Sequence, residues 1–166
     1  MKQNICVIGL NNVYTAKLGK TISDNFEMFF ADITELIKFE LMDVEHARAV
    51  CGDEYIHKVE RSKVKAVNTF ENTLFTMDYS LLNDETNLKT TQEHSFVIYL
   101  KLSKDNLLKI TDRNTYSGLI FDVYEFRDRL CEKYSDIIID CDNKSELEII
   151  KDIEEVFIKI SENYKK

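Results

Sequence analysis

The chain has 166 residues, of which 44% are apolar and 31% charged, and its formal net charge is −8. This composition is typical of one globular domain with an ordinary core, and it excludes a disordered chain. No run approaches ~20 apolar residues, which excludes a membrane-spanning helix, and the negative charge disfavours binding to nucleic acid. The apolar run near the start is too short for a signal peptide, so we expect a cytoplasmic protein.

Short apolar runs that alternate with helical patterns predict the order of elements. Five runs predict buried strands, over Asn4–Ile8, Glu27–Ala31, Thr73–Met77, Ser95–Leu102 and Asp136–Cys141. Apolar residues at helical spacing predict helices over Asn12–Asp24, Ile33–Val50, Asp53–Phe70, Ser103–Ile110, Leu119–Tyr134 and Ser145–Tyr164. Strands joined by crossover helices favour a parallel sheet covered on both faces, in a single α/β domain over residues 1–166.

Cap signals mark several helix boundaries. Asp32 is a candidate cap for the helix that begins at Ile33. Gly52 is expected to end that helix, and Asp53 is expected to cap the next one. Ser145–Glu148 resembles a capping box at the start of the last helix.

The four cysteines give no signal for a metal site. They are far apart in the sequence and form no Cys-x-x-Cys pair. We therefore expect buried thiols at Cys6, Cys51, Cys131 and Cys141.

The loop after the first strand is the first place to look for a ligand site, because ligands of parallel sheets bind beyond the carboxyl ends of the strands. A phosphate-binding P-loop requires Gly-x-x-x-x-Gly-Lys-Ser/Thr here. Gly9 supplies the first glycine, but Tyr14 replaces the second, and the side chain either fills the nucleotide's space or stacks on a base. Thr15 stands in place of the lysine, and Ala16 in place of the hydroxyl that holds magnesium.

The segment from Gly9 to Ser23 resembles the P-loop and first helix of shikimate kinases, in altered form. Later segments fall in the same order: Phe30–Ile37 resembles F-x-D-x-D-x-x-I, and Gly52–Glu60 resembles G-E-x-x-F-R-x-x-E. Arg127 and Tyr134–Asp140 are similar to the family's late arginine and last strand. The resemblance spans nearly the whole chain. It implies a three-layer P-loop kinase fold with a five-stranded parallel sheet in the order 2-3-1-4-5.

The resemblance also implies candidate site residues. Asp32 matches the aspartate on the magnesium side of the site, and is the candidate catalytic and metal residue. Thr34 and His57 replace an aspartate that holds shikimate hydroxyls and an arginine that holds the substrate carboxylate, whereas Arg127 keeps the family's identity. The candidate cofactor residues are those of the altered P-loop: Gly9, Asn11, Asn12 and Thr15.

Two further family features are altered. The family's lid corresponds to residues around 111–118, where Ser117-Gly118 replaces an Arg-Pro pair and only Arg113 adds a positive charge. Met77-Asp78-Tyr79 replaces the glycine triplet that follows the third strand.

Each candidate also has a purely structural interpretation. Asn11 and Asn12 suit a polar turn and helix cap as well as an anion site at a helix N-terminus. Asp32 suits a cap, His57 an exposed helix position, and Arg127 an ion pair within its own helix.

These losses favour a protein without phosphoryl transfer. That reaction depends on positioning and on charge from Lys, Arg and magnesium, and removal of one such donor costs ~3–4 kcal/mol. We expect a shikimate-kinase-like pseudoenzyme that needs no cofactor and binds a protein partner or a small polar or anionic ligand, with a homodimer also considered. The alternative is an active shikimate kinase-type phosphotransferase that acts on an alcohol group with ATP and Mg²⁺. A third interpretation is an oligomer whose exposed apolar helix face binds a partner.

Overall fold

The computed structural model describes residues 4–111 and 123–163 of the chain. Its centre is a five-stranded parallel sheet in the order β2-β3-β1-β4-β5. The strands are β1 Asn4–Ile8, β2 Phe29–Asp32, β3 Thr73–Met77, β4 Ser95–Lys101 and β5 Ile137–Asp140. Both the α/β class and the predicted strand order are confirmed. Every residue of β1 and β3 is buried, as their uninterrupted apolar sequences predict.

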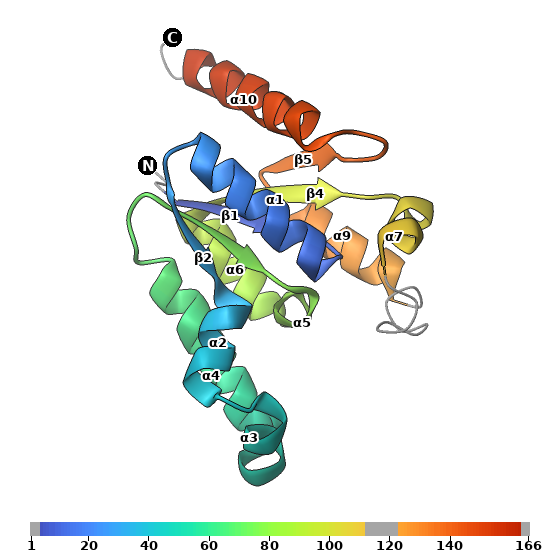
Figure 1. Ribbon diagram of the computed structural model, residues 1–166. Coiled ribbons are helices and arrows are strands. Elements are labelled where there is room, and N and C mark those ends of the chain that lie inside the picture. The colour runs from blue at the N-terminus through green and yellow to red at the C-terminus, as the bar shows by residue number, and fades with distance from the viewer. Residues whose placement is uncertain (1–3, 112–122, 164–166) are drawn as a thin grey trace.

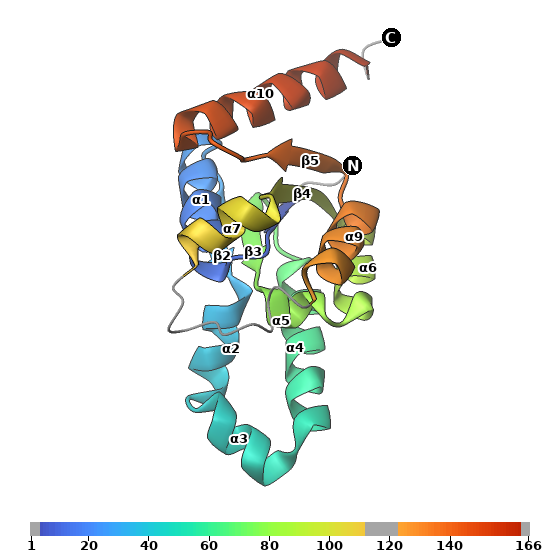
Figure 2. The same ribbon diagram turned by 90° about the vertical axis from the view of Figure 1, so that its right-hand side faces the viewer.

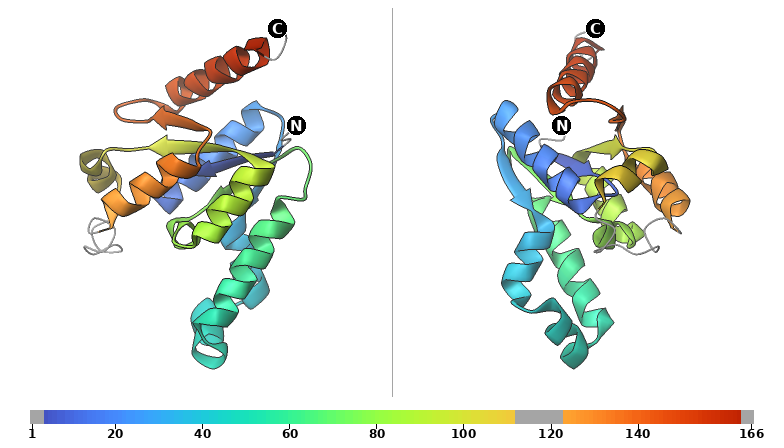
Figure 3. Two further views of the ribbon diagram at one scale, coloured as in Figure 1. Left: turned by 180° about the vertical axis from the view of Figure 1, so that it is seen from behind. Right: turned by 45° about the vertical axis from the view of Figure 1, so that its right-hand side comes forward.

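Helices cover both faces of the sheet. They are α1 Asn12–Asn25, α2 Ile33–Leu41, α3 Val44–Cys51, α4 Asp53–Val67, α5 Tyr79–Leu82, α6 Glu85–His94, α7 Lys104–Ile110, α9 Tyr124–Tyr134 and α10 Glu146–Asn163. Helix α1 lies against one face, while α6 and α9 lie against the opposite face (Figure 1; Figure 3, left). Helix α10 packs beside β5, where Phe157 contacts the rings of Phe26 and Phe96. No helix within the described ranges is long and apolar enough to cross a membrane.

Helices α2, α3 and α4 form an arm that projects from the β2 side of the sheet (Figure 2). Helix α3 at its tip has no buried residue. The large side chains of Phe39, Met42 and Val50 are exposed on this arm. Helix α3 therefore adds nothing to the core, whereas α2 and α4 contribute core residues such as Ile37 and Val64.

The prediction of one helix over Ile33–Val50 is wrong, because the chain turns between α2 and α3. Met42 takes a left-handed φ of 58°, and its N–H donates to Lys38 O at 2.8 Å, which ends α2. Asp43 then caps α3 by accepting a hydrogen bond from His46 N at 2.8 Å. With no core against which α3 could pack, local capping decides the break.

The cap of α4 also differs from the prediction. Gly52, at a φ of 84°, ends α3 and occupies the cap position of α4 without a side-chain bond. Asp53 instead lies in the first turn of α4 and pairs with Arg48. The other cap predictions are confirmed: Asp32 caps α2, and in the capping box Ser145 N donates to Glu148 Oε2 at 2.8 Å.

Three of the four cysteines are buried as predicted, at Cys6, Cys131 and Cys141. Cys51 is exposed, contrary to the prediction, because it lies on α3 outside the core. Burial raises the pKa of the Cys141 thiol to about 12 and also raises that of Cys6. The buried thiols are thus neutral core side chains at physiological pH.

Candidate functional site

A cavity of about 380 Å³ lies where β2 and β3 end, beside the first turns of α1 and α2. Helices α1 and α2 and the ends of both strands contribute its lining: Asn12, Val13, Thr15, Ala16, Asp32, Thr34, Glu35, Lys38, Thr76, Met77 and Asp78. The structure thus brings together four predicted site residues, Asn12, Thr15, Asp32 and Thr34. Ligands of parallel sheets bind at this edge, which makes the cavity the candidate site.

The turn before α1 is organised by Asn11. Its Oδ1 accepts the Tyr14 N–H at 2.9 Å, and its amide donates to Thr111 Oγ1 at 3.3 Å. The cap interpretation therefore holds for Asn11, which does not line the cavity, whereas Asn12 does. Because the cap takes up the Tyr14 N–H, that donor is not available to an anion at the helix N-terminus.

The side chain of Tyr14 is partly buried and does not line the cavity. Its ring packs against the hydrophobic core, and its hydroxyl hydrogen-bonds with Cys141, just after β5. Burial raises the pKa of Tyr14 above its ordinary value, and the nearby Glu146 and Asp142 carboxylates act in the same direction. The neighbouring Lys17 pairs with Glu146, so two contacts join α1 to the segment after β5.

Gly9 lies against the buried side chain of Thr15. A Cβ atom at Gly9 would come within 2.3 Å of Thr15 Oγ1, which is closer than Cβ atoms lie to non-bonded heavy atoms in proteins. The backbone of Gly9 does not need a positive φ, since Gly52 alone among the described glycines has one. Gly9 is therefore required here by the Thr15 hydroxyl.

This contact gives a test of local packing. Replacing Gly9 by Ala is expected to lower the free energy of unfolding by ~1–3 kcal/mol, because the added methyl overpacks the site. In a Thr15→Ala background the same change is expected to cost much less, since the clashing hydroxyl is gone. Denaturant unfolding of the parent, the two single variants and the double variant measures the coupling energy between Gly9 and Thr15. Equal costs in both backgrounds would show that Thr15 is not the residue that requires a glycine.

Asp32 has two roles at the cavity. Its Oδ1 accepts hydrogen bonds from Thr34 N at 2.9 Å and Glu35 N at 3.3 Å, so it caps α2. Burial raises the pKa of the Asp32 carboxyl, the two N–H bonds oppose that shift, and the negative charges of Glu35 and Asp78 reinforce it. The carboxylate is thus held in surroundings that supply little positive charge.

Asp78 directly follows β3 and caps the next helix, as Asp32 caps α2. Its Oδ1 accepts hydrogen bonds from Ser80 N at 2.9 Å and from Leu81 N at 3.2 Å, so Asp78 caps α5. Within residues 4–111 and 123–163, neither Asp32 nor Asp78 has a hydrogen-bond partner at Oδ2. Both carboxylates therefore retain an oxygen for a ligand.

The only cationic side chain among the described cavity-lining residues is already bonded. Lys38 Nζ lies 2.7 Å from Glu35 Oε1, and this bond is the main cause of the raised pKa of Lys38. Three carboxylates and one ammonium thus line the cavity. Over the described ranges, no group of three His, Cys, Asp or Glu side chains could hold a metal ion, so the role of Asp32 toward magnesium stays a prediction.

Three threonine hydroxyls line the same cavity without hydrogen bonds. Thr15, Thr34 and Thr76 hold the only buried side-chain oxygen or nitrogen atoms that lack a partner in the described part of the chain. Thr15 and Thr76 are only 1% and 3% exposed. Buried polar groups almost always find a partner, so three exceptions in one cavity call for an explanation.

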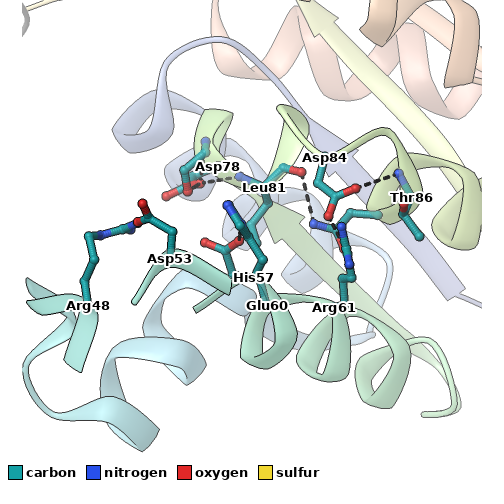
Figure 4. Close-up of polar contacts among 11 residues, drawn as sticks. Arg48, Asp53, His57, Glu60, Arg61, Asp78, Leu81, Asp84 and Thr86 are labelled. Atoms are coloured by element: carbon teal, nitrogen blue, oxygen red, sulfur yellow. Dashed lines mark hydrogen bonds and ion pairs between the residues drawn. The ribbon is translucent and has the colours of Figure 1, made fainter. Parts of the chain in front are cut away.

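His57 and Arg127 lie outside this cavity. His57 projects from α4, with Nδ1 2.9 Å from Glu60 Oε2 (Figure 4). Arg127 on α9 donates from Nε to Asn83 Oδ1 at 3.0 Å, at the end of α5, and its predicted ion pair within α9 stays a prediction. Their predicted roles in substrate binding remain predictions. The lid residues 112–118, with Arg113, lie outside the described part of the chain.

Sequence reasoning missed three polar lining residues: Glu35, Lys38 and Thr76. A usable signal was present. Asp32 pairs with Thr76 in the parallel register of β2 and β3, which brings the ends of the two strands together. Glu35 and Lys38 follow Asp32 at intervals of three residues, and so lie on the same face of α2.

No known family model matches the chain. Its curated relatives include the shikimate kinase of Dictyoglomus turgidum, 25% identical over 98% of this chain and 97% of that protein. The shikimate kinase of Xylella fastidiosa strain 9a5c is 22% identical, over 86% of this chain and 84% of its own length.

Solved structures agree in fold. A shikimate kinase from Acinetobacter baumannii, in complex with shikimate, has a TM-score of 0.82 at 14% identity, over 95% of this chain and 93% of that one. The enzyme from Aquifex aeolicus has a TM-score of 0.78 at 18% identity, over 97% and 98%. A gluconokinase from Sinorhizobium meliloti reaches 0.67 at 13% identity, over 99% and 96%. The chain is therefore a divergent, shikimate-kinase-like protein with the P-loop kinase fold.

Proposed function

We propose that this chain binds a small polar molecule in the cavity at the ends of β2 and β3 and does not transfer phosphate from ATP. One observation carries the proposal. Thr15 occupies the position where a P-loop has its lysine, and its hydroxyl is buried against Gly9. A neutral, buried side chain at this place cannot neutralise phosphate oxygens.

The charge of the cavity supports the same conclusion. Asp32, Glu35 and Asp78 line the cavity, and Lys38 is engaged by Glu35. A triphosphate brought here would meet carboxylates without a free cation among the described lining residues, and like charges at close range repel strongly. The lining residues thus supply no free cation to neutralise the phosphates of a triphosphate.

The backbone of the turn also supports it. P-loops hold phosphate through free N–H groups at the start of the helix. Here Asn11 Oδ1 accepts the Tyr14 N–H, and Tyr14 supplies bulk where a glycine would let phosphate approach. A turn stabilised by its own side-chain cap has less need of an anion.

The direct test is an assay of shikimate-dependent ADP release by the purified chain. We expect release no faster than in buffer, with intact fold confirmed by circular dichroism. Turnover that requires both shikimate and MgATP, at a rate of about 1 s⁻¹ or more as for ordinary enzymes, would overturn the proposal.

One observation favours the alternative of a working kinase. Asp32 lies at the end of β2 with a pKa raised by burial, a setting in which a carboxylate can act as a general base. If the chain were an ATP- and Mg²⁺-dependent kinase, Asp32→Asn would abolish ADP release while the cap of α2 persisted, because Asn caps helices as well as Asp. Activity that survives this substitution would exclude Asp32 as the base.

A further inference from the structure

The cavity contains hydroxyl groups whose hydrogen-bonding capacity is unused. Burying a hydroxyl without a partner costs free energy, because its bonds to water are lost and not replaced. Thr15 and Thr76 pay this cost at almost full burial, and Thr34 Oγ1 adds a third group in the same cavity. A ligand that carries hydroxyl groups could supply the missing partners once the side chains turn toward it.

The cavity also has more negative than positive charge. The Oδ1 atoms of Asp32 and Asp78 cap α2 and α5, which leaves Oδ2 of each without a partner in the described structure. Lys38 is bonded to Glu35 and does not bond either carboxylate. The negative charge of Asp78 helps to raise the pKa of Asp32, so a second carboxylate is close enough to disfavour the charged form of Asp32. A positively charged group placed beside Asp32 and Asp78 would offset this effect.

We propose that the cavity binds a small polyhydroxylated amine in its protonated form. Its ammonium group, with three hydrogen-bond donors, lies between Asp32 and Asp78, and its hydroxyls face Thr15, Thr34 and Thr76. A volume of about 380 Å³ suits a ligand at the small end of the usual range. The proposal rests on the binding role given to this cavity under Proposed function, but not on the loss of phosphoryl transfer.

This ligand class differs in charge from the anionic ligand considered from the sequence. A carboxylate or phosphate ligand would need an arginine or a free lysine to receive it. The two candidates from the sequence are engaged elsewhere, His57 with Glu60 and Arg127 with Asn83 (Figure 4 for His57). The acidic lining selects against anions and for an amine.

The test uses three six-carbon probes that differ in one group: glucamine, sorbitol and gluconate. Binding to the full chain is measured by calorimetry and by the shift in melting temperature, with each probe at about 10 mM, a weak-binding range. We expect glucamine to bind at least tenfold more tightly than sorbitol and gluconate to bind least. Glucamine that binds no better than sorbitol, or not at all, would overturn the proposal.

Matched variants locate the ammonium site. Asp32→Asn and Asp78→Asn keep a capping side chain and remove the charge, so we expect each to reduce the preference for glucamine over sorbitol about tenfold. Asp43→Asn is the control, because Asp43 caps α3 in the same way but lies outside the cavity. A preference unchanged by both cavity variants, or lost equally in the control, would contradict the assignment.

Thr76→Val tests the hydroxyls and remains informative if an aspartate variant fails to fold. Valine has the same shape as threonine, and the hydroxyl has no partner to lose, so the ligand-free protein should melt no lower than the parent. Binding of both glucamine and sorbitol should weaken severalfold. A marked loss of stability without ligand, or binding that is unchanged, would show that the Thr76 hydroxyl serves the fold and not a ligand.

The two proposals fail separately. Shikimate-dependent ADP release combined with a preference for glucamine would refute the proposed loss of phosphoryl transfer and leave the amine site standing. Absence of ADP release combined with equal binding of glucamine and sorbitol would refute the amine site and leave the proposed loss of phosphoryl transfer standing.

Discussion

Replacing Tyr14, Thr15 and Ala16 together by Gly, Lys and Ser is expected to give the chain at least a hundredfold higher affinity for MgATP. The variant completes Gly-x-x-x-x-Gly-Lys-Ser after β1, on a framework that already has the strand, the helix and Gly9. The glycine removes the bulk of Tyr14, the lysine supplies charge and the serine supplies a hydroxyl for magnesium. A factor of one hundred corresponds to ~2.7 kcal/mol of binding free energy, within the range of charge-assisted hydrogen bonds.

Isothermal titration calorimetry with MgATP measures this gain. The matched control is Thr21→Lys, which adds the same charge to α1 but two turns away from the loop. We expect the control to bind MgATP no better than the unmodified chain. If the control gained as much affinity as the triple variant, overall charge and not the loop would be responsible. If the triple variant folded but gained nothing, the three residues would not be what limits binding.

Phe75→Ala is expected to lower the free energy of unfolding by ~3–5 kcal/mol, the largest stability effect that we predict. Phe75 is fully buried in β3, between the neighbouring strands β1 and β2. Its loss leaves a cavity in the core. For a chain of this size the change corresponds to a fall of roughly 10 °C in melting temperature.

The same substitution at Phe39 is the control for Phe75. Phe39 lies on the projecting arm and is 87% exposed. Removing its ring should change the free energy of unfolding by less than ~0.5 kcal/mol, as for most surface sites. Thermal and denaturant unfolding of both variants measure the contrast. Equal losses at the two positions would show that the Phe39 ring packs against other residues and is not exposed.

The sequence predicted the sheet well because its strands are buried on both faces. Asn4–Ile8 and Thr73–Met77 begin and end where the structure has β1 and β3, since such strands are continuous apolar runs. Helix α6 was missed because it contributes few buried side chains to the core and reads as polar. The turn at Met42 was missed for a related reason: periodicity continues across it, and only the Asp43 cap marks the break.

The candidate site was predicted only in part because it depends on which strands are neighbours. The residues after β1 and β2 were found from the chain itself, and Asn12, Thr15, Asp32 and Thr34 do line one cavity. The contribution of β3 to the cavity lining follows from the register in which β3 pairs with β2. The missing hydrogen bonds of the three threonines could not be foreseen at all, because a sequence does not show which hydroxyls are buried without partners.

A calorimetric titration of the unmodified chain with MgATP tests the central claim most directly. Because Thr15 stands in place of the lysine and an acidic cavity lies beside it, we predict no heat of binding at ~1 mM nucleotide. Any Kd is then above about 1 mM, which corresponds to a binding free energy weaker than about −4 kcal/mol. Saturable binding in the micromolar range that disappears when magnesium is chelated would contradict the account.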